Sequence, residues 1–190
     1  MDDLAQRIYL DALERISSLN PLTSKDKKLV VSADAYIREH FDKGFHQLAS
    51  AGLTREGEII YGLQFDCKIA QHSQCAEYDL IVNVAEKRRV ALVAIVTVRA
   101  DGSVGVIEKT HVVYPCARCR EVARQCQKFL RVIVPFGPDD PKWISALEAN
   151  NLAKFPIDVL YPQVYAERRR SKPSRDLLEF EKEWNQDKGR

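Results

Sequence analysis

Two early segments of the chain carry apolar residues at three- and four-residue spacing, which predicts two amphipathic helices. The first covers residues 3–19 and ends at Asn20-Pro21. The second begins at Ser24, a favourable N-cap, and ends at Gly44. Its predicted inner face consists of Leu29, Val30, Ala33, Tyr36, Ile37 and Phe41.

Shorter apolar runs in the middle of the chain predict strands. The segments 46–54 and 57–65 flank Arg55-Glu56-Gly57 and predict a β-hairpin. "RVALVAIVTVR", residues 89–99, is the most apolar stretch and predicts a buried strand, with a turn at Asp101-Gly102. "LRVIVPF", residues 130–136, predicts a further strand.

Helical segments alternate with these strands. Residues 75–86 and 116–129 predict helices, residues 137–156 fit neither pattern, and residues 174–184 predict a charged terminal helix. A hairpin followed by helix, strand, helix and strand predicts an α/β fold with a mixed sheet flanked by helices.

Charge and composition exclude some functions without selecting one. The 190 residues are 45% hydrophobic, and 29 Lys and Arg against 27 Asp and Glu give a net charge of +2. This balance gives no overall attraction to nucleic acid or to an anionic membrane. No apolar run has the length of a membrane span, and "MDDLAQRIYL" does not read as a signal peptide, so we expect a cytoplasmic protein.

The cysteines carry the strongest chemical signal. "PCARCRE", residues 115–121, places Cys116 and Cys119 at the start of a predicted helix, where free N–H groups stabilise thiolates. These two alone could be a redox pair or ordinary helix-start cysteines. Cys75 begins another predicted helix, and three thiolates with an open fourth position are typical of a catalytic zinc site. Glu77, two residues beyond Cys75, could then carry protons beside the metal. If Cys67 joined them, the site would instead be a closed structural zinc.

Cys-Ala-Glu followed by Pro-Cys-x-x-Cys resembles the zinc-dependent cytidine deaminases. "GLQFD", starting thirteen residues before Cys75, resembles the family's Gly-x-Asn-x-Glu, and "HQLASAGLTREG" resembles its Phe-x-Val-Gly-Ala-Ala strand and Thr-x-x-Gly turn. "PCARCREV" resembles Pro-Cys-Gly-x-Cys-Arg-Gln-Val, and "VLYPQVY" resembles Leu-Leu-Pro-x-x-Phe. The similarity spans roughly residues 30–166.

This resemblance implies a cytidine-deaminase-like three-layer α/β fold in residues 23–166. Residues 1–22 are then an N-terminal extension helix, and residues 167–190 are a charged C-terminal extension helix. It also implies one Zn²⁺ per chain, a small-molecule nucleoside or nucleoside analogue as substrate, and a homotetramer in which Tyr165 lies near a neighbouring pocket. The site residues it implies are Cys75, Cys116 and Cys119 on the metal, Glu77 as the proton carrier and Ala76 at the base edge.

The chain departs from the family pattern where the family binds its substrate. Gln64 and Asp66 stand in place of the Asn and Glu that hold the ribose hydroxyls, and His46 stands in place of a Phe that packs on the base. The replacement side chains can still form hydrogen bonds, but their polar groups would lie at different positions, because Gln is longer than Asn and Asp is shorter than Glu. The substrate could therefore be a modified nucleoside or another aminated heterocycle.

A second departure concerns charge near the metal. Three thiolates on Zn²⁺ leave a net charge of −1, and the Arg that commonly follows Cys-Ala-Glu is here Tyr78. Arg118 or Arg120 could offset that charge by hydrogen bonding to a thiolate. The position of Arg118 between the two cysteines resembles the Cys-Gly-Arg-Cys-Arg motif of blasticidin S deaminases.

Two other functions stay open. One is a catalytically inactive, zinc-stabilised binding module. The other is a deaminase acting on nucleic acid, for which the basic cluster at residues 168–172 is the only support.

Overall fold

The computed structural model describes residues 11, 15, 18, 20–67, 72–103, 105–127, 129–136 and 152–160. Most of the helix predicted over residues 3–19 lies outside these ranges, and so do Tyr165 and the helix predicted over residues 174–184. The division into residues 1–22, 23–166 and 167–190 therefore stays a prediction.

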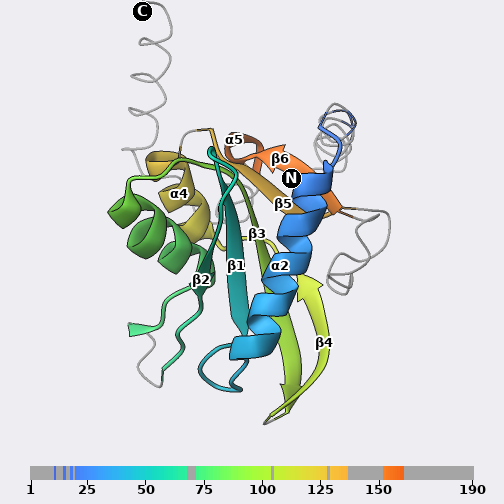
Figure 1. Ribbon diagram of the computed structural model, residues 1–190, viewed down its shortest axis with the longest axis vertical. Helices are drawn as coiled ribbons and strands as arrows, with labels where there is room; N and C mark the ends of the chain where they lie inside the picture. The colour runs from blue at the N-terminus through green and yellow to red at the C-terminus, as the bar shows by residue number, and fades with distance from the viewer. Residues whose placement is uncertain are drawn as a thin grey trace, which may run out of the picture.

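A six-stranded mixed sheet forms the centre of the molecule (Figure 1). The strand order is β2–β1–β3–β5–β6, and β4 also pairs with β3. The β3–β5 pair is parallel, and the other described pairs are antiparallel. The bounds are β1 Leu48–Thr54, β2 Ile59–Leu63, β3 Leu92–Ser103, β4 Val106–Val112, β5 Arg131–Pro135 and β6 Leu152–Pro156. The mixed sheet and the β1–β2 hairpin were predicted correctly.

The long strand β3 shares one of its edges between two partners. β5 pairs with Ala94–Val96 of β3, and β4 pairs with Val98–Ser103. The chain therefore leaves this edge at the end of β4, forms helix α4 (Ala117–Cys126), and returns to the same edge as β5. The Tyr114 hydroxyl donates to the carbonyl oxygen of Pro135 at 2.6 Å, which ties the end of β5 to the segment that enters α4.

Helix α2, Ser24–His40, covers one face of the sheet (Figure 1). Its capping box uses Thr23 and Asp26, so the predicted cap at Ser24 is one residue too late. The side-chain oxygen of Thr23 accepts from the Asp26 N–H, and the Thr23 N–H donates to the Asp26 carboxylate at 2.8 Å. The predicted inner face is confirmed. Its fully buried part is Leu29, Val30, Ala33 and Ile37, which pack on Ala49, Ala51, Val96 and Val98 of the sheet.

The opposite face is covered by α3 (Ala76–Tyr78), the π-helix η2 (Asp79–Glu86), α4 and α5 (Ile157–Leu160). Its core includes Leu80, Ile81, Ala123, Leu130, Phe155 and Leu160. Helix, sheet and helix form three layers, which is the cytidine-deaminase-like architecture that the motifs implied. In the part of the chain that the structure describes, no helix combines the length and apolarity needed to cross a membrane.

Two expectations about strands were wrong or incomplete. The turn predicted at Asp101-Gly102 is absent, because β3 continues to Ser103 through a shift in register. Its hairpin turn follows Ser103 and uses Gly105 at φ 74°. Strand β6 was missed because Lys154 interrupts its apolar run, yet that side chain is buried against Asp26.

Gly62 of β2 lets this strand lie close to the backbone of α3 and η2. A side chain at position 62 would overlap the backbone of Ala76 and Leu80, which cannot move as a flexible side chain can. We therefore expect Gly62→Ala to displace α3 and to cost at least the ~1–3 kcal/mol typical of overpacking. Urea unfolding measures the loss of stability.

Gly52→Ala is the matched control for this prediction. A methyl group there would meet the side-chain ends of Leu92 and Leu80, which can adjust. Equal stability losses for the two variants would show that the close approach at Gly62 has no special importance.

Candidate metal centre and active site

Two helix starts bring three cysteines together. Cys75 is the N-cap of α3, and Cys116 is the N-cap of α4. Cys119 lies one turn into α4 and is buried, and its backbone N–H donates to the Cys116 sulfur at 3.5 Å. The Sγ atoms of the three residues all lie within 4.8 Å of one another.

The spacing fits a tetrahedral metal ion. The Sγ atoms of Cys75 and Cys116 are 3.7 Å apart, and two thiolates on one tetrahedral Zn²⁺ lie about 3.8 Å apart. Cys67 is outside this cluster, so the closed four-thiolate alternative is not supported. All five cysteines are free. A redox pair needs only two cysteines, so the third sulfur of the cluster favours a metal site over a redox pair. The cluster can hold a metal through three ligands.

The charges in the cluster favour a cation. Hydrogen bonds from the Cys119 and Cys75 thiols lower the pKa of Cys116, and the backbone N–H groups of Cys119 and Arg118 act in the same direction. The same hydrogen bonds to Cys116 raise the pKa values of Cys75 and Cys119, and burial adds to both shifts. Without a metal, the cluster therefore favours one thiolate, at Cys116, that accepts hydrogen bonds from two thiols. A divalent cation would allow all three cysteines to ionise.

Glu77 lies beside the cluster with its side chain buried at 3% exposure. Burial raises the pKa of its carboxyl group to about 7, and hydrogen bonds from Thr97 and Cys119 act in the opposite direction. A carboxyl group with this pKa can take up and release a proton near neutral pH, as a general acid–base group must.

Sequence reasoning missed the hydroxyl groups that lie next to Glu77. Thr97 of β3 hydrogen-bonds the Glu77 carboxyl, and the side-chain oxygens of Ser50 and Thr97 lie 2.7 Å apart. Ser50 is 0% and Thr97 3% exposed. The available signal was weak: two hydroxyl residues within otherwise apolar strand segments.

The three predicted substrate contacts lie together at the open end of the β1–β2 hairpin, where the chain enters β1 and leaves β2. His46 Nδ1–H donates to the carbonyl oxygen of Gln64 at 2.6 Å, and the Gln64 side chain accepts from the backbone N–H of Gln47 at 3.3 Å. The Asp66 carboxylate accepts from the Ser73 hydroxyl at 2.7 Å.

The same hairpin end is hydrogen-bonded to the segment that leads to the cysteine cluster. Phe65 and Gln74 exchange two backbone hydrogen bonds of 3.0 and 2.7 Å, and Gln74 directly precedes Cys75. The structure thus brings Gln64 and Asp66 to the segment that carries the first thiolate. Their contact with substrate stays a prediction.

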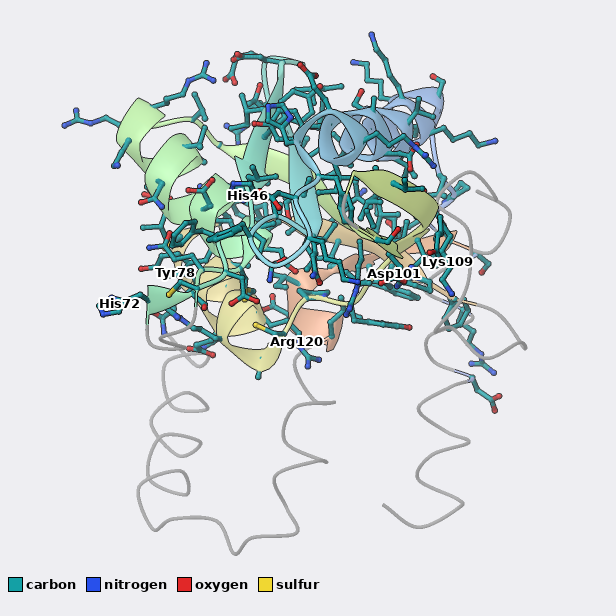
Figure 2. All side chains as sticks on the ribbon, turned by 90° about the horizontal axis from the view of Figure 1, so that it is seen from below. His46, His72, Tyr78, Asp101, Lys109 and Arg120 are labelled. Carbon is teal, nitrogen blue, oxygen red and sulfur yellow. The ribbon has the colours of Figure 1, made fainter. Side chains whose placement is uncertain are left out.

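The arginines lie on both sides of the α4 start. The Arg118 guanidinium stacks 4.5 Å from the ring centre of Tyr78, and Arg120 Nη1 donates to the carbonyl oxygen of Leu160 at 2.9 Å. Figure 2 shows His46 and Tyr78 on one side of the molecule and Asp101 and Lys109 on the other, with Arg120 between the two sides. Hydrogen bonding of either arginine to a thiolate stays a prediction.

Ala76 and Tyr165 complete the predicted set. Ala76 is fully buried at the start of α3, and its carbonyl oxygen faces Gly62 of β2. Tyr165 is outside the described residues. The proposed roles of both residues stay predictions.

The structure defines a class of protein with a three-layer α/β fold and, at two helix starts, a cysteine cluster that could hold a metal ion beside a buried carboxyl group. Comparison with known proteins identifies this class more closely. The chain is 30% identical over 145 residues to the blasticidin-S deaminase of Bacillus cereus, which covers 76% of this chain and 94% of that protein. The structure is similar to the cytidine deaminase of Bacillus anthracis, with a TM-score of 0.54, 17% identity and coverage of 75% of this chain and 93% of that one. No profile of a known protein family matches the chain. The chain belongs to the cytidine deaminase-like family.

Proposed function

We propose that the protein is a zinc-dependent hydrolytic deaminase of a cytidine-like nucleoside or a related aminated heterocycle. The observation that carries this proposal is the cluster of Cys75, Cys116 and Cys119 beside the buried carboxyl group of Glu77. The relationship to a blasticidin-S deaminase supports the reaction type.

The three cysteines would hold Zn²⁺, which on a three-ligand site lowers the pKa of water. Glu77 takes a proton from the attacking water and gives it to the ring nitrogen of the substrate. The water oxygen bonds to the carbon that carries the amino group. Glu77 then takes the remaining proton from the added oxygen and delivers it to that amino group, so the C–N bond breaks as the C=O bond of the product forms, and ammonia leaves. The raised pKa of Glu77 suits a group that must gain and lose a proton in each cycle.

The open end of the β1–β2 hairpin would supply the groups that recognise the substrate. His46, Gln64 and Asp66 would contact the part of the substrate beyond the base, and the Ala76 backbone would face the base edge. Because the carboxylate of Asp66 is already held by Ser73, its direction is fixed before substrate arrives. A homotetramer in the cytoplasm, with Tyr165 near a neighbouring pocket, belongs to the same proposal.

The test is ammonia release from a substrate panel. Zinc-loaded protein is incubated with cytidine, deoxycytidine, blasticidin S and aminopurines, and ammonia and zinc content are measured on the same sample. Release from one of these compounds in proportion to zinc content is the expected result. A zinc-loaded protein that releases none would favour the binding module, since the His46 and Asp66 side chains already have partners within the protein.

A further inference from the structure

A pair of buried hydroxyl groups lies directly behind the Glu77 carboxyl. Ser50 and Thr97 face each other across the β1–β3 pair, and their side-chain oxygens are 2.7 Å apart. Thr97 also bonds the carboxyl of Glu77. The three residues form a chain of polar groups from the sheet to the catalytic side of the molecule.

This chain of polar groups lies in the interior, where apolar side chains would be expected. The flanking residues Ala49, Ala51, Val96 and Val98 turn to the α2 face and are fully buried. Ser50 and Thr97 alternate to the other face, where Leu80 and Ile95 are core residues. A buried hydroxyl costs free energy unless it is hydrogen-bonded. Here both hydroxyl groups are bonded, and this chain of polar groups ends on the Glu77 carboxyl group beside the cysteine cluster.

A hydroxyl group can hold two partners at once, because it offers one donor and two acceptor lone pairs. Either oxygen of the Ser50–Thr97 pair can be the donor. Because Ser50 occupies one side of the Thr97 hydroxyl group, that hydroxyl group is held in place and its other side is left for the Glu77 carboxyl group.

We propose that Thr97 is a positioning residue, supported by Ser50, which holds the Glu77 carboxyl group in one orientation. Thr97 touches neither the metal ligands nor the substrate in this proposal, and it acts only through Glu77. The kinetic part of the test rests on the proposed function, and the spectroscopic part does not.

The kinetic test compares variants of nearly equal shape. Thr97→Val removes the hydroxyl group, Thr97→Ser keeps it, and Ser50→Ala removes the second member of the chain. Loss of a hydrogen bond to a charged group predicts a fall in kcat of roughly 10- to 100-fold for Thr97→Val, with KM within about twofold of the parent. Thr97→Ser recovers most of kcat, and Ser50→Ala loses less than Thr97→Val.

Thr110→Val is the matched control. Thr110 is also a buried strand residue, and its hydroxyl accepts from Arg38 at 3.0 Å on the α2 face of the sheet. We expect Thr110→Val to lower the free energy of unfolding without changing kcat. If Thr97→Val keeps the parent kcat, or if Thr97→Ser loses as much as Thr97→Val, the positioning role is wrong.

Infrared difference spectroscopy on zinc-loaded protein tests the same contact without any substrate. The carboxyl band of Glu77 is the one that disappears in Glu77→Gln. We expect this band to shift in Thr97→Val and to stay in place in Thr97→Ser and Thr110→Val. An unshifted band in Thr97→Val overturns the proposal even if the parent protein is an active deaminase. A shifted band in a protein that releases no ammonia supports the hydroxyl chain and contradicts the proposed function alone.

Discussion

Glu77→Gln should almost abolish ammonia release while leaving the zinc site and the fold in place. The substitution keeps the shape of the side chain and its capacity to bond Thr97, but it removes the group that gains and loses a proton. General acid–base groups contribute on the order of 10²–10⁴-fold in rate, and Glu77 handles more than one proton in each cycle. The loss in kcat should therefore reach the upper end of that range.

The measurements are ammonia release, zinc content and melting temperature on one preparation of each protein. Replacing a buried, partly protonated carboxyl group by a neutral amide removes a desolvation cost, so the melting temperature should not fall. Turnover at the parent rate would show that another group moves the protons.

Lys154→Met should destabilise the protein by about 3–5 kcal/mol, because it leaves the Asp26 carboxylate buried without its cation. Lys154 Nζ lies 2.5 Å from Asp26 Oδ2, and the two side chains are 8% and 3% exposed. The pair joins β6 to the first turn of α2, where Asp26 also completes the capping box with Thr23. Urea unfolding at neutral pH measures the change.

The double variant Asp26→Asn with Lys154→Met is the control, because it removes both charges. It should be closer to the parent than Lys154→Met alone. Equal losses in the single and double variants would show that the buried charge of Asp26 does not cause the effect.

The same ion pair predicts a dependence on pH. Burial raises the pKa of Asp26, but hydrogen bonds from Lys154 and Thr23 outweigh it, and the net pKa is below the ordinary value of 3.8. A lowered folded-state pKa stabilises the fold above the unfolded-state value, and this stabilisation is lost as pH falls through the folded-state value. Below about pH 4 the parent should therefore lose stability more steeply than the double variant.

The cysteine cluster was predictable from sequence because each of its two halves is a local motif, although Cys75 and Cys116 are 41 residues apart. A spacing of three residues at a helix start brings Cys116 and Cys119 to the same turn, and Cys75 begins a second helix two residues before Glu77. The apolar periodicity of α2 was equally local, and its buried face agrees with the prediction.

The features that sequence reasoning missed depend on partners far along the chain. Lys154 reads as a break in a strand until Asp26, 128 residues earlier, neutralises it. Thr97 reads as an ordinary strand residue until Ser50, 47 residues earlier, and Glu77 are placed beside it. The stacking of the Arg118 guanidinium on Tyr78 was also missed, because only the packing of α3 against α4 brings the two residues together.

Zinc content after single cysteine substitutions tests the central claim most directly. Parent protein should hold one zinc per chain, and Cys75→Ser, Cys116→Ser and Cys119→Ser should each lose the metal and the release of ammonia. Cys67→Ser, which changes a cysteine outside the cluster, should keep both. Zinc retained in Cys75→Ser or Cys119→Ser, together with zinc lost in Cys67→Ser, would contradict a three-thiolate catalytic centre in this protein.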